Sequence, residues 1–452
     1  MLIALAVGSF FVALCTVQAA EPTDTSDSSN SSTADQSDAV AKGKQGSSQL
    51  GTVVVTGQLT PGIDQTAAFD RQHEAENEIN ILSMKNIEQT PAKTIGQAVQ
   101  QLPGVSVQHD TGEPRFAQIR GTDANLNTIT YNGVVLPSYF PGYRAVPLDS
   151  VPVNLVSNID VIKTLLPNMD GEGIGGQFNL EPKSAFDYKG MHTEIDLEGG
   201  IGSLLGTPTA YGSVTFADTF NIGPEAKLGI LVSALYDWKQ FGIDDLEESY
   251  STPGTAISNK SISSYTLRHY TYDRRRAGVG TNIDLRLDEN NRFYLDFVYG
   301  GYDEYRTPRL ETTYSGLDAT SQANVLSNGS FVTTPGNVAV QKTREDTLQQ
   351  NRFFTIIAGG ENKFQGFDLD YKASYSEASQ DQPYYNVYKF NSLPGAINGT
   401  LIYNNRGNNG DSPTIKLNGL SSLNNPQNYT FTNSVNQSFS STDGIFGFQT
   451  NL

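Results

Sequence analysis

The chain has 452 residues, of which 37% are hydrophobic, and 30 Lys and Arg against 48 Asp and Glu give a net charge of −18. This excess of negative charge argues against nucleic acid as a partner and against electrostatic binding to anionic lipid headgroups. Cys15 is the only cysteine, so the chain can form no internal disulfide. Beyond its N-terminal segment the chain has no long apolar run, but a membrane β-barrel would also lack one, because its apolar residues alternate with polar ones.

The first 19 residues are predicted to be a signal peptide. Leu2 to Val17 form an apolar run that is too short to cross a membrane, and the small residues up to Ala19 fit a signal-peptidase site. A lipoprotein signal through Cys15 is the weaker alternative, because Leu14 is too large for the position before a lipidated cysteine.

A short β-branched segment follows a polar linker. Residues 20–50 are rich in Ser, Thr, Asp and Gly, and they cannot bury enough apolar surface to offset their ordering entropy, so we expect disorder. The segment after the linker is either the first strand of the next domain or a peptide that a partner adds to the edge of its own sheet. Its position at the end of a flexible arm favours the second interpretation. The segment is Thr52-Val53-Val54-Val55-Thr56.

The stretch from Thr90 to Leu180 is typical of a small α/β domain with short elements and many glycines. Thr90 can cap a helix that begins at Pro91 and ends at Pro103-Gly104. A strand is expected over residues 105–108. Asn132-Gly133 between apolar runs predicts a hairpin over residues 129–136, because a type I′ turn needs positive φ at both central residues.

Two ligand-binding patterns in this stretch are rejected. Gly171, Gly173 and Gly176 match the spacing of a dinucleotide-binding loop, but residues 177–180 alternate like a strand where that site needs a helix. Residues 168–173 imitate a calcium loop, yet its twelfth position is Asn179 rather than Glu. The glycines are therefore assigned to tight turns and close packing, and no cofactor or metal is expected.

Five sequence blocks in this stretch, in their order, resemble the plug domain of TonB-dependent outer-membrane receptors. The residues of these blocks are similar to those of the sugar-associated branch found in xanthomonads and caulobacters. One departure follows Lys163, where Thr164 to Asn168 replace the usual Gly-x-x-Ser stretch. The blocks are Gln101-Leu-Pro-Gly-Val105, Ile119-Arg-Gly121, Thr130-Tyr-Asn-Gly-Val134, Ile159-Asp-Val-Ile-Lys163 and Gly171-Glu-Gly-Ile-Gly-Gly-Gln-Phe-Asn-Leu180. The resemblance implies that residues 52–56 are a TonB box. It also implies structural roles in the plug for Arg120, Gly121, Asn132, Gly133, Gly173, Gly175 and Gly176.

Beyond Gly190 the pattern changes to long strands with period two. In residues 191–201, Ile195 and Leu197 face one way while Glu194 and Asp196 face the other. A soluble β-sandwich would also alternate, and without the plug it would be as good an interpretation. Three further stretches alternate in the same way, short turns separate some strands and long loops separate the others, as in transmembrane β-barrels. The stretches are 279–287, 293–299 and 367–375; the turns are 221–225, 288–291 and 362–366; the loops are 241–270, 304–347 and 380–440.

The sequence therefore predicts an α/β plug domain followed by an incomplete transmembrane β-barrel. The strands after the plug number roughly eight, whereas plugged transporters of this type close with about 22 strands. We therefore expect a fragment of a longer product. The predicted organisation is signal peptide 1–19, disordered linker 20–50, TonB box-like segment 51–57, plug domain 58–190 and N-terminal part of the barrel 191–452.

The sequence contains no catalytic constellation, so an enzyme is not expected. The histidines at positions 73, 109, 192 and 269 are scattered and lack the spacing of metal ligands. Arg274-Arg275-Arg276 is interpreted as a solvated rim cluster beside a long loop, with phosphate binding as the weaker alternative. The acid pairs Asp244-Asp245 and Glu247-Glu248 are interpreted as solvated loop charges.

The resemblance implies energy-coupled uptake of a scarce solute across the outer membrane of a Gram-negative bacterium. TonB of the inner-membrane energy complex would pull residues 52–56, and lipid would surround the barrel. The branch favours a carbohydrate, such as an oligosaccharide, with a ferric siderophore as the alternative. A truncated remnant that transports nothing is a further alternative, whereas a signalling receptor would need an extra N-terminal domain. By analogy, the plug apex that binds the solute contains Tyr139, Phe140, Tyr143 and Arg144.

Overall fold

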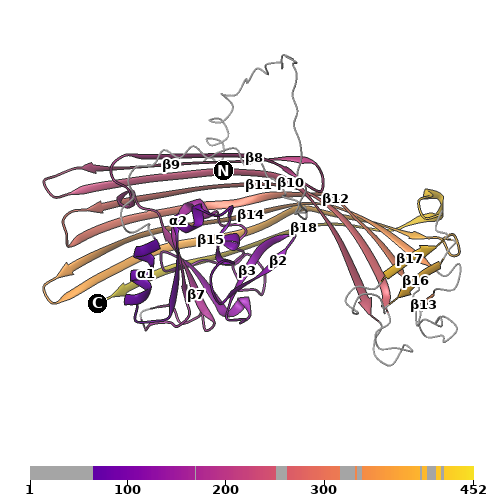
Figure 1. Ribbon diagram of the computed structural model, residues 1–452, viewed down its shortest axis with the longest axis horizontal. Coiled ribbons are helices and arrows are strands. Elements are labelled where there is room, and N and C mark those ends of the chain that lie inside the picture. Colours follow the sequence, from indigo (N-terminus) through magenta and orange to yellow (C-terminus); the bar gives the residue numbers. More distant parts are fainter. Residues whose placement is uncertain are drawn as a thin grey trace, which may run out of the picture. The chain divides into compact units, whose positions relative to one another are not determined.

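The computed structural model describes residues 65–167, 169–250, 262–315, 331–332, 338–397, 400–404, 414–418 and 422–452. The predicted signal peptide, the linker and residues 52–56 lie outside these ranges. A small N-terminal α/β domain packs on one face of a long antiparallel sheet (Figure 1). Among the described residues, no helix has the length and apolar character needed to cross a membrane.

The N-terminal domain places short helices around a mixed five-stranded sheet. The strand order is β1-β6-β7-β4-β5, in which β4 and β7 are parallel and the other neighbours antiparallel, and β2 and β3 form a separate hairpin. The elements are α1 (Gln65–Glu74), β1 (Ile79–Ser83), α2 (Met84–Glu88), α3 (Ile95–Val99), β2 (Val105–Asp110), β3 (Glu113–Ile119), the 3-10 helix η2 (Ala124–Leu126), β4 (Asn127–Tyr131), β5 (Val134–Val135), η3 (Val153–Leu155), β6 (Val156–Ile162), β7 (Gly176–Pro182) and η4 (Ala185–Asp187).

The helix predicted from Thr90 onward begins four residues later than expected. Thr94, not Thr90, caps α3, because the Thr94 hydroxyl accepts from the Gln97 amide and the Gln97 side chain accepts from the Thr94 amide. This reciprocal pair satisfies two amides that the first turn leaves open. The Thr90 hydroxyl instead donates to the Ile87 carbonyl at 2.7 Å and closes α2. The predictions of a strand from Val105 and of a hairpin through residues 129–136 are confirmed.

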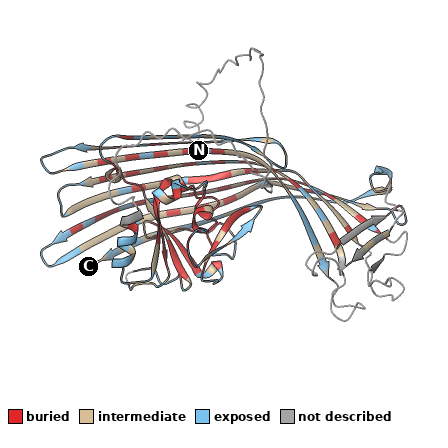
Figure 2. Ribbon diagram, in the orientation of Figure 1, coloured by how far each residue is buried: buried red, intermediate tan, exposed pale blue. Residues whose placement is uncertain are grey.

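The core of the N-terminal domain is continuous with the inner face of the long sheet. Ile159 and Phe178, on the apolar face of the small sheet, are fully buried. Val298 and Phe353, from the long sheet, belong to the same hydrophobic cluster, and Figure 2 shows buried residues on both sides of the contact. Because burial of apolar surface stabilises by roughly 25 cal/mol per Å², this shared core holds the two parts together.

The second part of the chain is one eight-stranded antiparallel sheet, as the fold prediction required. Its order is β18-β15-β14-β12-β11-β10-β9-β8, so neighbours in sequence are neighbours in space except where short strands intervene. A separate small sheet, β13-β16-β17, forms within the longer connections. The strands are β8 (His192–Gly202), β9 (Thr207–Asn221), β10 (Lys227–Tyr250), β11 (Ile262–Arg286), β12 (Asn291–Ser315), β13 (Phe331–Val332), β14 (Ala339–Phe364), β15 (Phe367–Ser392), β16 (Thr400–Asn404), β17 (Thr414–Asn418) and β18 (Tyr429–Asn451).

The three short turns of the long sheet are confirmed, but the three long loops were predicted too long. β10 continues to Tyr250 and β11 starts at Ile262, so most of the predicted loop 241–270 is strand. The same holds for the predicted loops 304–347 and 380–440, where β12, β14, β15 and β18 continue. These halves of the strands, away from the short turns, carry polar residues on both faces and lose the apolar alternation, while their backbone pairing continues with local register shifts.

The two faces of the long sheet differ as the alternation predicted. On β8, Ile195 and Leu197 are 52% and 67% exposed and lie on the face away from the N-terminal domain. On the inner face, Asp196 and Glu198 pair with Lys93 of the N-terminal domain. All of these strands lie in one continuous sheet, so the arrangement of two facing sheets expected for a β-sandwich is not found in the described residues.

Candidate functional site

The turn between β4 and β5 docks the N-terminal domain on the long sheet. Asn132 and Gly133 have φ values of 48° and 72°, as a type I′ turn requires. The Asn132 amide donates to the Asp296 carboxylate at 2.7 Å, and the Lys372 ammonium donates to the Asn132 carbonyl at 2.9 Å. The left-handed turn therefore aims one side chain and one carbonyl at the sheet.

Of the glycines assigned to the plug structure, Gly173, Gly175 and Gly176 lie where side chains have no room, whereas Gly171 has open space around it, so close packing does not explain Gly171. A Cβ at Gly176 would stand 2.6 Å from the Ile119 side chain and 2.8 Å from the Ile162 carbonyl, and its φ is 132°. Gly173 and Gly175 meet comparable obstacles within the domain. Arg120 has a positive φ of 54° and pairs with Glu78, and Gly121 follows it with φ 72° in open space.

The loop predicted to be the solute-binding apex divides into a buried and an exposed half. Tyr139 is buried and its hydroxyl lies 3.2 Å from that of Ser150. Phe140 packs on Tyr139 with ring centroids 4.8 Å apart. Tyr143 and Arg144 are more than half exposed, and Arg144 pairs with Glu172.

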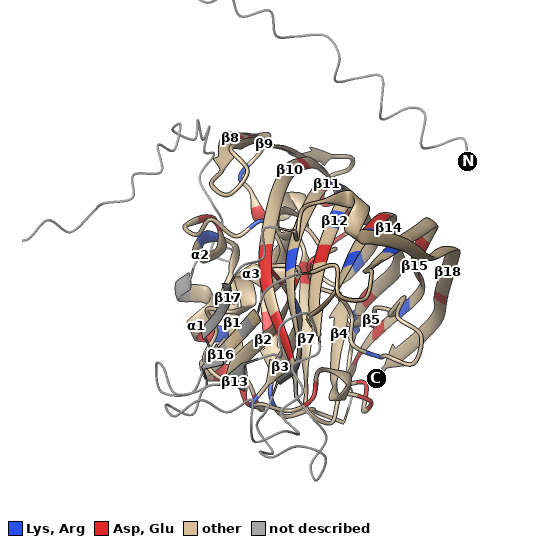
Figure 3. Cartoon of the chain, turned by 90° about the vertical axis from the view of Figure 1, so that its right-hand side faces the viewer, with Lys and Arg blue, Asp and Glu red and all other residues tan. Residues whose placement is uncertain are grey.

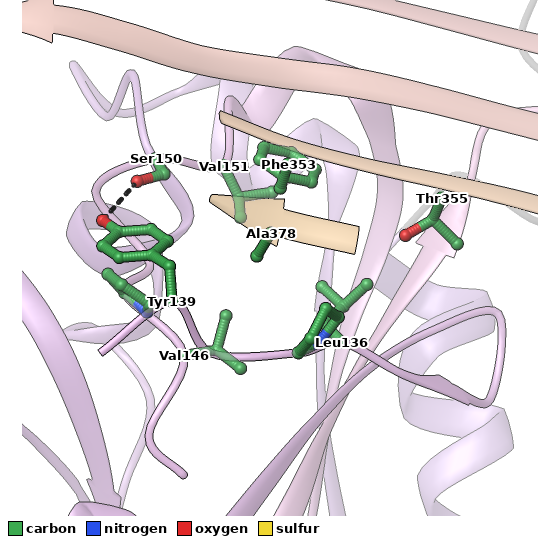
Figure 4. A pocket seen from close by; sticks show the side chains of 10 residues that line it. Leu136, Tyr139, Val146, Ser150, Val151, Phe353, Thr355 and Ala378 are labelled. Atoms are coloured by element: carbon green, nitrogen blue, oxygen red, sulfur yellow. Dashed lines mark hydrogen bonds between the residues drawn. The ribbon is translucent and has the colours of Figure 1, made fainter. Parts of the chain in front are cut away.

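A small apolar pocket separates this loop from the long sheet. Leu136, Tyr139 and Val146 line it from the N-terminal domain, and Phe353 and Ala378 line it from the sheet (Figure 4). Its volume is about 10 Å³, which is room for no more than a single water molecule. The pocket is a packing defect between the two parts rather than a solute site.

The β2–β3 turn contacts the long strands beyond the shared apolar core. Gly112 in this turn lies next to Ile243. Ile243 is eight residues further along β10 than Leu235, which stands in the row of the sheet that runs through Phe353. β10 continues beyond this contact to Tyr250, and we call the turn the floor of the inner face that follows.

A buried carboxylate at the β2–β3 turn collects three cations from the sheet. The Glu113 side chain is 6% exposed and pairs with Lys239 of β10 and with Arg274 and Arg276 of β11. Arg274 and Arg276 are each only 1% exposed. Arg274 also donates to the Thr111 hydroxyl at 3.1 Å, so the turn is fixed at both of its ends.

A second group of charges connects the same hairpin to β12. Arg115 of β3 pairs with Asp110 and with Asp149, whose carboxylate lies 3.3 Å from the guanidinium. The Tyr302 hydroxyl accepts from Arg115 at 2.8 Å and donates to Asp149 at 3.0 Å. Arg276 donates to the Asp149 carbonyl at 3.0 Å and Arg274 lies 4.6 Å from the Tyr302 ring centroid, so these two arginines join the two groups. Glu304, two residues further along β12, pairs with Arg274.

The two parts of the chain bring complementary charges to this contact, which we call the ion network. The long sheet contributes four cations and two carboxylates, a net +2, and the N-terminal domain contributes one cation and three carboxylates, a net −2. Acidic and basic patches lie side by side on these strands in Figure 3. Replacing a whole buried network of this kind by apolar residues often leaves the stability of the fold unchanged or higher. Removing a single member lowers the stability, because it leaves a buried charge unpaired. The members are Lys239, Asp237, Arg274, Arg276, Glu304 and Arg306 of the sheet, with Asp110, Glu113, Arg115 and Asp149 of the N-terminal domain.

Beyond the floor, the inner face of the sheet carries tyrosine and arginine in adjacent rows, which we call the chamber wall. The Arg309 guanidinium stacks 4.0 Å from the Tyr270 ring centroid and pairs with Glu345 at 2.8 Å. Arg306 pairs with Glu304 at 2.6 Å and lies across from Tyr272. The Tyr272 ring stacks on that of Phe241 with centroids 4.9 Å apart. The chamber wall consists of Phe241, Tyr270, Tyr272, Arg306, Arg309 and Glu345.

The interpretation of Arg274-Arg275-Arg276 as a solvated rim cluster is wrong for two of the three residues. Arg274 and Arg276 point inward from the middle of β11 and are buried, and only Arg275 is exposed. Residues 279–287 alternate between the two faces of the sheet. Continuing that alternation back to residues 274–276 could have assigned the three arginine side chains to their faces from the sequence. The acid pairs predicted in a loop lie on β10, where Asp244 and Glu247 are more than half exposed and pair with His269 and Arg268.

Among the described residues, no group of three or more His, Cys, Asp or Glu side chains could hold a metal ion. The predicted coupling segment, residues 52–56, lies outside the described ranges. The candidate site therefore consists of the chamber wall, the β2–β3 turn below it and the buried ion network between them.

Comparison with known proteins gives a consistent assignment for the N-terminal domain. Residues 71–176 match the model of the TonB-dependent Receptor Plug Domain. The vitamin B12 transporter BtuB of Vibrio cholerae serotype O1 is 24% identical over 163 residues, which are 35% of this chain and 25% of that protein. The chain thus spans about a quarter of the length of this curated relative.

Two solved structures match the chain at low identity and low structural similarity. The ferric citrate transporter FecA in its unliganded form is 11% identical, with a TM-score of 0.33, over 88% of this chain and 63% of that one. BauA, the ferric preacinetobactin receptor from Acinetobacter baumannii, is 12% identical, with a TM-score of 0.37, over 82% and 61%.

Proposed function

We propose that this chain, whose N-terminal domain matches the plug-domain model of TonB-dependent receptors and is followed by a long antiparallel sheet, is part of a transporter. The transporter would take a scarce solute across the outer membrane of a Gram-negative bacterium. This family consists of transporters rather than enzymes. The observation that carries the proposal is the plug packed on the inner face of strands whose other face is apolar. TonB, outer-membrane lipid and a small solute are the proposed partners, and residues 52–56 are the proposed coupling segment.

Uptake that depends on energy is the direct test of this proposal. Cells that produce the complete receptor should accumulate solute, and a proton ionophore or deletion of TonB should abolish accumulation while surface binding continues. Accumulation that persists without TonB would contradict energy coupling. Absence of any binding or uptake for every solute tested would favour the truncated remnant.

For the solute, the chamber wall supports an anionic metal chelate such as a ferric siderophore better than a carbohydrate. Arg306 and Arg309 stand beside Tyr272 and Tyr270, and each arginine already pairs with a carboxylate of the sheet. Each arginine uses one N–H toward its carboxylate, and its further N–H groups can donate to an anionic ligand. The prediction of a sugar rests on the resemblance of the plug sequence and on the balance of aromatic, acidic and amide residues in the apex and the long loops. The sequence relative is named for vitamin B12.

Transcript levels distinguish the two solute classes at low cost. Induction during iron starvation, with no response to plant or algal glycans, supports the chelate, whereas induction by a glycan alone supports the carbohydrate. The residue-level test is Arg309→Gln, which should weaken binding of ferric citrate, used as an anionic probe, by about tenfold or more. Arg344→Gln is the matched control, because Arg344 is 54% exposed and pairs with Asp346 on the opposite face of the same sheet. Equal affinities for the two variants would contradict the assignment.

A further inference from the structure

A polar groove opens on the long sheet where the pairing of β15 is interrupted. Two residue steps along β14, from Gln350 to Leu348, are matched by three steps along β15, from 381 to 384. β15 therefore bulges, and Pro383 in the bulge cannot donate a backbone hydrogen bond to a neighbouring strand. The groove beside the bulge has a volume of about 350 Å³, which lies within the range of ligand pockets.

This groove lies on the face of the sheet that points away from the N-terminal domain. Ile356 of β14 and Phe446 of β18 mark that face, because they are 41% and 84% exposed. Gln350 and Ser440, which line the groove, each stand six residues before one of those two and therefore share their face. In a membrane barrel this is the face that meets lipid.

Successive rows of this outer face change from apolar to cationic to anionic. Phe354 of β14 and Tyr375 of β15 pack together with ring centroids 5.5 Å apart. Arg352 follows two residues beyond Phe354, on the side away from the short β14–β15 turn, and the row of Asp381 follows after two more residues. A step of two residues along a strand is about 7 Å. An aromatic group, a guanidinium and a carboxylate thus stand in line.

The two charged groups keep binding capacity for a ligand. Arg352 is 32% exposed and pairs with Asp303 of β12. Asp381 accepts a hydrogen bond from the Ser440 hydroxyl at 2.5 Å, and no ion pair among the described residues includes it. A carboxylate can accept about four hydrogen bonds. Asp381 therefore offers free acceptor positions to a positively charged donor.

We propose that the groove binds the phosphoethanolamine headgroup of a membrane lipid. The ammonium group lies at Asp381, the phosphate at Arg352 and the acyl chains along Phe354. Aromatic residues mark the ends of the apolar band of a membrane barrel, so the rows beyond Phe354 stand at the level of the headgroups. Acyl chain, phosphate and ammonium follow one another outward in such a lipid in the same order as the three rows. The inference goes beyond solute uptake, but it rests on the proposed function for the membrane around the strands.

Hydrogen bonding makes this site selective among lipids. An ammonium group has three N–H donors and can bind the Asp381 carboxylate through charge-assisted hydrogen bonds. A choline headgroup has the same charges but no N–H donor, so it gives Asp381 only an electrostatic contact. A headgroup with a phosphate alone brings negative charge next to Asp381 and is repelled. The groove therefore favours ethanolamine over both.

Native mass spectrometry of the purified complete receptor tests the site. The receptor is offered an equimolar mixture of phosphatidylethanolamine and phosphatidylcholine with identical acyl chains, so that the two lipids differ only in their N–H donors. The wild type should retain the ethanolamine lipid severalfold more often. Asp381→Asn should abolish this preference, whereas Arg352→Gln should lower the retention of both lipids and leave the preference unchanged.

Glu377→Gln is the matched control, because Glu377 is an outward carboxylate of the same strand that already accepts from the Tyr375 hydroxyl at 2.6 Å. It should change neither the retention nor the preference. Ser440→Ala removes the hydroxyl that competes for Asp381 and should maintain or raise the preference.

Equal retention of the two lipids by the wild type, or a preference that survives Asp381→Asn, would overturn the headgroup site. Loss of the preference in Glu377→Gln would place the ammonium group at Glu377 and overturn its assignment to Asp381. Transport is a separate readout. If uptake proves independent of TonB, the proposed function fails while the lipid preference still stands, whereas energy-coupled uptake by a receptor without lipid preference refutes the headgroup site alone.

Discussion

Replacement of Glu113 by Gln should loosen the β2–β3 hairpin from the sheet while preserving side-chain volume. The wild-type carboxylate is 6% exposed and faces Lys239, Arg274 and Arg276. Loss of its charge leaves these three cations with only Asp237 and Glu304 of the sheet as close partners. Removal of one member of a buried ion pair costs about 3–5 kcal/mol. Since Lys239 keeps partial contact with solvent, we expect the lower end, about 3 kcal/mol.

Hydrogen exchange of the amides in residues 105–119 measures the free energy of local opening of this hairpin. A loss of about 3 kcal/mol should accelerate exchange by roughly 100- to 200-fold. Glu361→Gln is the control, because Glu361 is 51% exposed in its pair with Arg292, and exposed pairs contribute less than about 1 kcal/mol. A second variant, Glu113→Gln with Lys239→Met, should recover part of the protection by removing one of the stranded cations. If Glu113→Gln exchanges no faster than Glu361→Gln, the ion network does not hold the hairpin.

Two further predictions concern the coupling segment and the close-packed glycines. Val54→Pro removes a backbone donor and fixes φ, so uptake by the complete receptor should fall while solute binding to intact cells persists; unchanged uptake would exclude residues 52–56 as the coupling segment. Gly176→Val would place a side chain 2.6 Å from Ile119 at a φ of 132°, so the amount of folded receptor should drop severalfold. A normal amount of folded receptor with an unchanged melting temperature would show that the backbone can move to accept the side chain.

The local elements of the plug could be predicted from short-range chemistry. The pair Asn132-Gly133 predicts a type I′ turn by itself, because this turn needs positive φ at two successive positions and Asn followed by Gly adopts such angles most readily. The start of α3 was missed because two threonines precede it, and the Gln97 side chain selects Thr94 over Thr90. That choice depends on a reciprocal hydrogen bond, which a search for single capping residues does not detect.

The candidate site was harder to predict because it joins residues far apart in the sequence. Glu113 meets Arg274 across 161 positions and Arg115 meets Tyr302 across 187. Nothing local marks these residues as partners. The strand halves away from the short turns were predicted as loops because polar and charged residues stand on both faces there, so the apolar alternation that marks a strand disappears. The chamber wall lies in that part, so Tyr270 and Arg309 were assigned to loops rather than to a site.

The contacts of the plug also indicate how far its N-terminal end can move. Among the described residues, the ion-pair partners of Arg71 are Asp160 and Glu181 of the plug, and β1 is an edge strand that pairs with β6. Departure of α1 and β1 therefore leaves the ion network intact. The next element, α2, is tied to the sheet, because Met84 is 3% exposed and clusters with Ala217 and Leu231.

Met84 should therefore be the point at which displacement from the N-terminal side stops. Met84→Ala removes about 2–5 kcal/mol of packing and should let displacement continue into α2. A cysteine introduced at the buried Ile87 of α2 reports this directly. It should resist a soluble thiol reagent in energised cells with Met84 in place and react severalfold faster with Met84→Ala. Equal reactivity of this cysteine with Met84 and with Met84→Ala would mean that α2 is displaced in both receptors or in neither. The contact of Met84 with the sheet would then not limit the displacement.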